Sequence, residues 1–179
     1  MKRYVVLFEK MFLIFFVFSC LGWIYEVLLY LIRDNEFVNR GFLVGPYLPI
    51  YGFGALILYY LLWNFIKKKH KIGKVNINII LVFVIIFIVT TFIEYVSHYF
   101  LDTYFGIILW DYSDDFLNIN GRVCFEASRN FAIGGTFSLY CIQPLIERFV
   151  TKFNNKKFYH IIIGILFLIM LADFLIKIF

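Results

Sequence analysis

Five long apolar runs dominate the chain and are separated by shorter polar segments. A helix needs about 20 apolar residues to cross the hydrocarbon core of a bilayer, and each run has close to that length. The runs are continuous rather than alternating, which argues against the strands of a membrane barrel. The pattern predicts an all-α membrane bundle with five transmembrane helices in a single domain, residues 1–179. We place the spans at about 11–32, 50–66, 75–101, 123–146 and 158–178.

Basic residues are distributed unequally over the connections between these runs. With five spans, one side of the membrane carries twelve lysines and arginines and the other side carries four. Cytoplasmic loops are rich in lysine and arginine, so we expect the N-terminus inside and the C-terminus outside. The first run continues to Ile32, which favours a retained span over a cleaved signal peptide.

Composition supports the same class of protein. Hydrophobic residues make up 63% of the chain and the mean hydropathy is +0.84, whereas globular domains are nearer about 45–50% apolar. We therefore expect a multi-pass protein of the cell (plasma) membrane, in contact with the lipid bilayer. The net charge of +5 is explained by the orientation of the spans, and we expect no nucleic acid. The chain lacks a phosphate-binding loop, so we do not expect it to be an ATPase itself. We also expect no cofactor.

The connection between the first two runs, residues 39–54, is unusual. It holds two of the three prolines and four of the eleven glycines. Pro46 and Pro49 interrupt a regular helix, and the orientation places this connection outside. We expect Arg40 to turn toward a carboxylate within the bundle.

Ionisable residues within the spans lie in their outer halves. Such residues are costly in hydrocarbon, at about 2.5–3.5 kcal/mol on insertion scales, and call for a partner or a function. Their depth predicts a polar pocket that faces outward above a charge-free inner part. The predicted pocket residues are Glu26, Arg40, Glu94, Asp102, Asp111, Tyr112 and Arg122. A structural polar network is predicted for Glu126, Arg129 and Asn130 on one face of the fourth span.

Alternative interpretations exist for several of these residues. Glu26 and Glu94 are equally suited to act as structural counter-ions of Arg40 and Arg122. Glu94, His98 and Asp102 recur at i+4 and are weak candidates for metal ligands, so we predict no metal site. Asp173 is expected to pair with Lys177 at i+4.

The chain also contains a possible internal repeat. The first half carries Glu26, then an outer segment with Asn39, Arg40 and Gly41, then a returning span. The second half carries Glu94, then a segment that ends at 120–122 with Asn, Gly and Arg, then a returning span. The halves share a direction, which predicts a parallel two-helix repeat about an axis along the membrane normal.

Several motifs resemble those of a known family. They are Gly22-Trp23-x-x-Glu26, the block from Asn39-Arg40-Gly41-Phe42 to Tyr51-Gly52-x-Gly54, Trp110-Asp111-Tyr112-Ser113 and Asn118-x-x-Gly121-Arg122-x-Cys124. Together they are similar to the CmpB-type family of ABC-transporter membrane proteins. This resemblance implies a polytopic membrane protein with a transport role and no assigned substrate. Glu94 and Asp102 fit the family pattern, whereas His98 and the Arg129-Asn130 pair depart from it.

Three functions are compatible with these features. The leading hypothesis is a binding or transport component of permease type. It would need a homo-oligomer or a partner membrane protein, with a possible separate ATPase. The second is an intramembrane enzyme that acts on a lipid or lipid-linked substrate, in which Glu94, His98 and Asp102 supply acid–base chemistry. The third is a structural or regulatory subunit of a membrane complex. No nucleophile-and-base signature stands out, so we assign no catalytic residue and rank an enzyme below a transport component.

Overall fold

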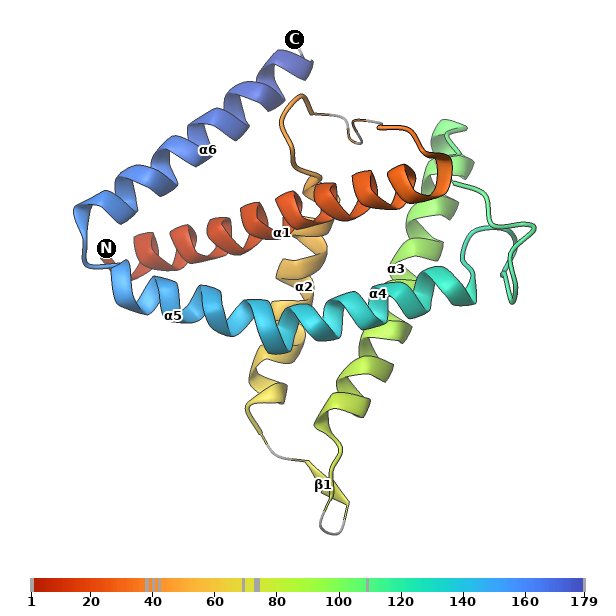
Figure 1. Ribbon diagram of the computed structural model, residues 1–179, viewed down its shortest axis with the longest axis horizontal. Helices are drawn as coiled ribbons and strands as arrows, with labels where there is room; N and C mark the ends of the chain where they lie inside the picture. The colour runs from red at the N-terminus through yellow and green to blue at the C-terminus, as the bar shows by residue number, and fades with distance from the viewer. Residues whose placement is uncertain are drawn as a thin grey trace. The chain divides into compact units, whose positions relative to one another are not determined.

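The computed structural model describes residues 2–37, 39, 41, 43–68, 70–72, 75–108 and 110–178 (Figure 1). The described chain is almost entirely helical, as predicted. The elements in order are α1 (Lys2–Asp34), α2 (Pro49–Ile66), β1 (Lys71–Ile72), β2 (Val75–Asn76), α3 (Asn78–Phe105), α4 (Phe125–Phe137), the π-helical segment η1 (Ser138–Ile142), α5 (Gln143–Phe153) and α6 (Lys157–Ile178).

Four helices are long and apolar enough to cross a membrane: α1, α2, α3 and α6. They coincide with four of the five predicted spans. The apolar windows of α3 and α6 are only 11% buried within the protein. Their large side chains are therefore free to contact lipid, which explains why so many apolar residues lie on the surface.

The remaining predicted span, the fourth in the chain at about 123–146, is more complex. Helical hydrogen bonding continues from Phe125 to Phe153, but η1 interrupts the α-helix in the middle. π-Helical segments widen the turn and interrupt the regular i to i−4 ladder. The α5 part is amphipathic: it buries Gln143, Ile146 and Val150, and it exposes Arg148 and Lys152. Neither α4 nor α5 alone has the length of a span.

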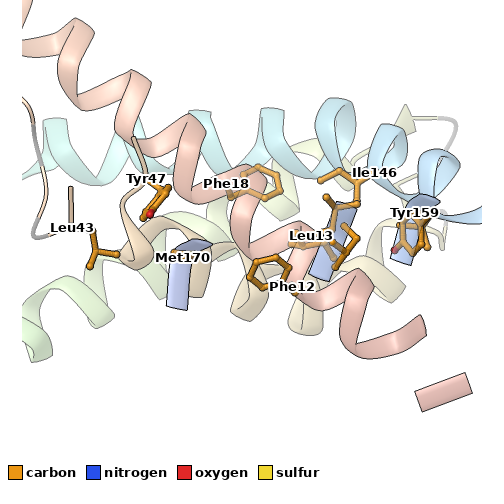
Figure 2. Packing of buried hydrophobic residues seen from close by; sticks show 11 residues of the cluster. Phe12, Leu13, Phe18, Leu43, Tyr47, Ile146, Tyr159 and Met170 are labelled. Atoms are coloured by element: carbon orange, nitrogen blue, oxygen red, sulfur yellow. The ribbon is translucent and has the colours of Figure 1, made fainter. Parts of the chain in front are cut away.

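The contacts divide the chain into two compact units. Unit 1 comprises Met1–Tyr60 and Ile142–Phe179, and unit 2 comprises Leu61–Cys141. Unit 1 holds a core that joins α1 to α5, α6 and the segment before α2, shown in Figure 2. Its buried members are Phe12, Leu13, Ile14, Phe18, Leu43, Tyr47, Ile146, Val150, Tyr159, Ile163 and Met170.

The start of α2 lies very close to the middle of α1. A Cβ atom on Gly52 would lie 2.6 Å from the carbonyl oxygen of Phe15, so only glycine fits there. One turn earlier, the amide of Leu48 donates a hydrogen bond to the carbonyl of Ser19, at 2.9 Å. The glycine-rich and proline-rich segment is therefore docked on α1.

Asp173 on α6 holds the same segment from another side. Its carboxylate accepts hydrogen bonds from the amides of Val44 and Gly45, at 3.1 and 2.8 Å, and from the hydroxyl of Tyr47, at 2.6 Å. Lys177, the predicted partner, does interact electrostatically with Asp173. The hydrogen bonds to the segment before α2 were not predicted from the sequence.

Charged residues in the N-terminal part of α1 contact polar residues of other helices. His160 Nδ1 lies 2.7 Å from an oxygen of Glu9, which is buried. The ammonium of Lys10 donates to Tyr59 at 2.8 Å and to Glu147 at 3.2 Å. Glu9 and Lys10 lie in the candidate span Tyr4–Ile32, just before the predicted span of residues 11–32. Their side chains find polar partners on other helices of unit 1.

Unit 2 is built on α3 and α4, which pack along each other. Thr91 donates to Ser128 across this contact at 2.7 Å. At the other end of α3, β1 and β2 form a short antiparallel hairpin in which Ile72 pairs with Val75. The buried side chain of Asn78 accepts a hydrogen bond from the backbone amide of His70 at 2.7 Å. This contact attaches the connection between α2 and α3 to the start of α3. This lysine-rich connector is folded rather than a plain linker.

The Asp173 contact predicts a measurable loss of stability. Replacement of Asp173 by Ala removes three hydrogen bonds to a charged acceptor and should lower the unfolding midpoint by roughly 5 °C. Tyr47→Phe removes one of the three and should have a smaller effect. Thermal unfolding of the purified protein in detergent measures both. Glu36→Gln, at an exposed position, is the control; equal midpoints for Asp173→Ala and this control would contradict the prediction.

Candidate functional site

The connection between α3 and α4, residues 106–124, folds back on the C-terminal part of α3. The amide of Tyr112 donates to the carbonyl of Gly121 at 2.8 Å, and Ile119 pairs with Val123. The indole of Trp110 donates to the carbonyl of Arg122 at 2.9 Å. The two ends of this connection are therefore held together. We call it the α3–α4 loop.

Three polar residues at successive i+4 positions on α3 each contact this loop. Glu94 accepts a hydrogen bond from the hydroxyl of Tyr112 at 3.1 Å. His98 Nε2 lies 3.0 Å from the carbonyl oxygen of Trp110. Asp102 forms a salt bridge with Arg122 at 3.1 Å. The sequence predicted that these residues share a helix face, and the loop supplies a different partner for each.

Arg122 is enclosed by groups from α3. Its guanidinium lies 5.6 Å from the ring centre of Tyr95 and 5.0 Å from that of Tyr99, in cation–π geometry. Hydrogen bonds to Asp102 and then to Tyr95 raise the pKa of Arg122 above its usual value. Arg122 forms its described ion pair with Asp102, and the alternative role of Glu94 as its counter-ion stays a prediction.

Two buried atoms beside these contacts lack a hydrogen-bond partner among the described residues. They are Oε2 of Glu94 and Nδ1 of His98. His98 is only 7% exposed. A buried acceptor without a donor loses its hydration and gains nothing in return. This pair is therefore the least satisfied part of the α3–α4 loop contact.

Asp111 stabilises the loop itself. Its carboxylate accepts from the amide and the hydroxyl of Ser113, at 2.9 and 2.6 Å, in an Asx turn. The hydrogen bonds from Ser113 lower the pKa of Asp111 below its usual value. The carboxylate is exposed and remains ionised at neutral pH.

Arg129 contacts both other members of the network predicted on α4. Arg129 lies 3.3 Å from Glu126 and donates to Asn130 at 3.1 Å. These contacts are local, and the Glu126 side chain is 67% exposed. Among the described contacts, Arg122 donates hydrogen bonds to Tyr95 and Asp102 of α3.

The remaining predicted residues belong to unit 1. Glu26 accepts a hydrogen bond from the hydroxyl of Tyr51 at 2.5 Å, and Trp23 donates to Asn39 at 2.7 Å. Arg40 lies outside the described residues, so its predicted contact with a carboxylate stays a prediction. Since Glu26 belongs to unit 1 and Glu94 to unit 2, a single pocket that joins them also stays a prediction.

No group of three potential metal ligands occurs among the residues that the structure describes. Glu94, His98 and Asp102 instead contact three different groups of the loop. A hollow of about 450 Å³ occurs in unit 1, lined by Leu7, Met11, Leu56, Tyr59 and Tyr60. It is apolar and does not include a predicted site residue.

Sequence reasoning missed the tyrosines that complete these contacts. Tyr95 and Tyr99 were not among the predicted site residues, although both contact Arg122. The spacing of Tyr95 and Tyr99 on α3, one residue after Glu94 and His98, was a usable signal. It predicts a second aromatic stripe beside the acidic one.

Gly121 offers a test of the loop geometry. Its φ is +68°, and a Cβ atom there would lie 2.5 Å from Ser113 Oγ and 2.8 Å from Asp111 Oδ1. Gly121→Ala should therefore open the Asx turn and make the loop more sensitive to protease. Gly106 is a matched control, because its φ is +65° but a Cβ atom would meet nothing within 4 Å. Equal protease sensitivity of both alanine variants would show that backbone strain alone matters.

Comparison with known proteins gives one match. The family described as "Putative ABC-transporter type IV", named ABC_trans_CmpB, matches residues 13–178. Neither the curated proteins nor the solved structures contain a match to this chain. The family match covers nearly the whole sequence and agrees with the four apolar helices. The chain is therefore a membrane protein that belongs to the CmpB-type ABC-transporter family.

Proposed function

We propose that this protein is the membrane-embedded binding component of a transport system, with a polar site at the outer end of α3. The observation that carries the proposal is the α3 face of Glu94, His98 and Asp102 covered by the α3–α4 loop. It gathers charged and aromatic groups within a helix that is otherwise apolar. Ionisable groups at such positions mark substrate or ion pathways.

The proposed topology has five spans with the N-terminus in the cytoplasm. In this arrangement α4, η1 and α5 together form the fourth span. Their continuous helix is longer than the ~20 residues that a bilayer requires. The exposed Arg148 and Lys152 of α5 would then lie at the cytoplasmic surface, in agreement with the distribution of lysine and arginine.

The contacts of the two carboxylates support the proposed repeat. Glu26 of α1 accepts from Tyr51, which follows the first outer segment. Glu94 of α3 accepts from Tyr112, which belongs to the second. Each half thus pairs a helical carboxylate with a tyrosine hydroxyl from the following segment. We propose that Glu94, Asp102, Asp111, Tyr112 and Arg122, all of unit 2, line an outward-facing pocket.

Transport also requires partners. The chain has no nucleotide-binding motif, so a separate ATPase would supply the energy. Lipid-facing helices as exposed as α3 and α6 leave surface for a second copy or a partner membrane protein. We place the assembly in the plasma membrane.

Removal of the Glu94 charge should impair transport. Glu94→Gln preserves an acceptor for Tyr112 but removes the negative charge. A panel of labelled small solutes identifies those whose uptake differs between cells that express the protein and cells that lack it. For these solutes, we expect Glu94→Gln to reduce uptake at least tenfold at equal protein level. Asp114→Asn, at an exposed position of the same loop, should transport like the wild type, and wild-type uptake by Glu94→Gln would refute the proposal.

The topology predicts the location of the C-terminus. A reporter fused after Phe179 should report an external location, because an odd number of spans separates the two ends. The same reporter fused before Met1 should report the cytoplasm. If both reporters are cytoplasmic, α4 and α5 do not cross the membrane and the protein has four spans.

A structural or regulatory subunit is the second candidate function. The observation in its favour is that several charges are compensated within the chain. Asp102 pairs with Arg122, Lys10 with Glu147, and Glu9 with His160. Such pairs hold helices together without a ligand. Normal solute uptake by Glu94→Gln, together with co-purification of a defined membrane complex, would favour this function.

A further inference from the structure

Glu94 and His98 each present one buried acceptor atom that the protein does not satisfy. The two residues stand four positions apart on α3 and therefore on one face of the helix. The atoms are Glu94 Oε2 and His98 Nδ1, and neither has a hydrogen-bond partner among the described residues. Both side chains are fixed by the α3–α4 loop through their other polar atom.

The contact with Trp110 determines which nitrogen of His98 carries a proton. A carbonyl oxygen only accepts hydrogen bonds, so Nε2 of His98 must donate to Trp110 across 3.0 Å. In the neutral ring, Nδ1 is then an acceptor. It is buried in a residue that is 7% exposed, and it requires a donor.

Glu94 lacks a donor at Oε2 among the described residues, and none of the described ion pairs includes this carboxylate. Its described hydrogen bond comes from the neutral hydroxyl of Tyr112. Arg122, the basic residue of the loop, already forms a salt bridge with Asp102. Asp111 adds a second negative charge on the side of His98. The surroundings are therefore acceptor-rich and negative, which disfavours an anion and favours a cation that donates hydrogen bonds.

We propose that Glu94 and His98 form the acceptor part of a binding site for a protonated amine, either ammonium or the head of a primary amine. Such a group carries one positive charge, which balances the carboxylate. It also carries at least three N–H donors, which is enough to supply one to each of the two acceptors. This inference rests on the proposed function and names the substrate class of the same site. It gives His98 a role as an acceptor rather than as a metal ligand.

The chemistry distinguishes an amine from other cations. Tetramethylammonium has the same charge but no N–H group. Sodium also has the charge but donates no hydrogen bond. A site that merely attracts positive charge would respond to all three cations, whereas the proposed site requires the donors.

The experiment uses the full-length protein in lipid nanodiscs and titrates methylammonium chloride at constant ionic strength. Thermal unfolding and tryptophan fluorescence are recorded, because the Trp110 ring lies 5.5 Å from that of His98. We expect a saturable rise of the unfolding midpoint with methylammonium and none with tetramethylammonium or sodium. An equal response to the three cations, or no response to methylammonium, would overturn the proposal.

Two variants assign the effect to the two acceptors. Glu94→Gln removes the charge, and His98→Gln retains an amide donor for Trp110 while it removes the Nδ1 acceptor. Each should weaken the apparent affinity for methylammonium at least tenfold, whereas Asp114→Asn should bind like the wild type. Wild-type affinity in both glutamine variants would also overturn the proposal. If the amine does not bind but Glu94→Gln still loses solute uptake, this inference fails and the proposed transport function stands.

Discussion

Asp173 joins the last helix of the chain to its first long connection. Its carboxylate accepts three hydrogen bonds from the segment before α2, two from backbone amides and one from a hydroxyl. Leu43 and Tyr47 of that segment are buried in the same core as Met170 of α6. The segment contains Pro46 and several glycines and cannot satisfy its own amides as a helix would. The packing of α1, α6 and the start of α2 in unit 1 depends on this external acceptor.

Tyrosine hydroxyls donate hydrogen bonds to the carboxylates on α1 and α3. Tyr51 donates to Glu26 and Tyr112 donates to Glu94. A neutral donor stabilises a carboxylate without the desolvation of a second charge, which makes buried ion pairs costly. At Glu94, none of the described ion pairs cancels the negative charge. Asp102 differs from Glu94, because its negative charge is already balanced by Arg122.

The sequence was sufficient to predict the helical class, the approximate limits of the apolar helices and the shared face of Glu94, His98 and Asp102. These features depend on composition and local periodicity. The partners of the charged residues could not be predicted, because they depend on contacts between distant segments. Glu9 and His160 are 151 positions apart, and Asp173 and Gly45 are 128 apart. The π-helical segment at Ser138–Ile142 also has no clear signature in its residue types.

The length of α1 has a consequence for the membrane around the protein. The candidate span on α1, Tyr4–Ile32, has 29 residues, or about 43 Å at 1.5 Å per residue, whereas the hydrocarbon core is about 30 Å thick. A tilt of the helix, a local thickening of the bilayer or an apolar stretch shorter than this span would each relieve the difference in length. Glu9 and Lys10, near the start of the span, allow the apolar stretch to end early, because polar side chains tolerate the headgroup region. The protein should therefore adapt to bilayers of different thickness through the angle of a single helix.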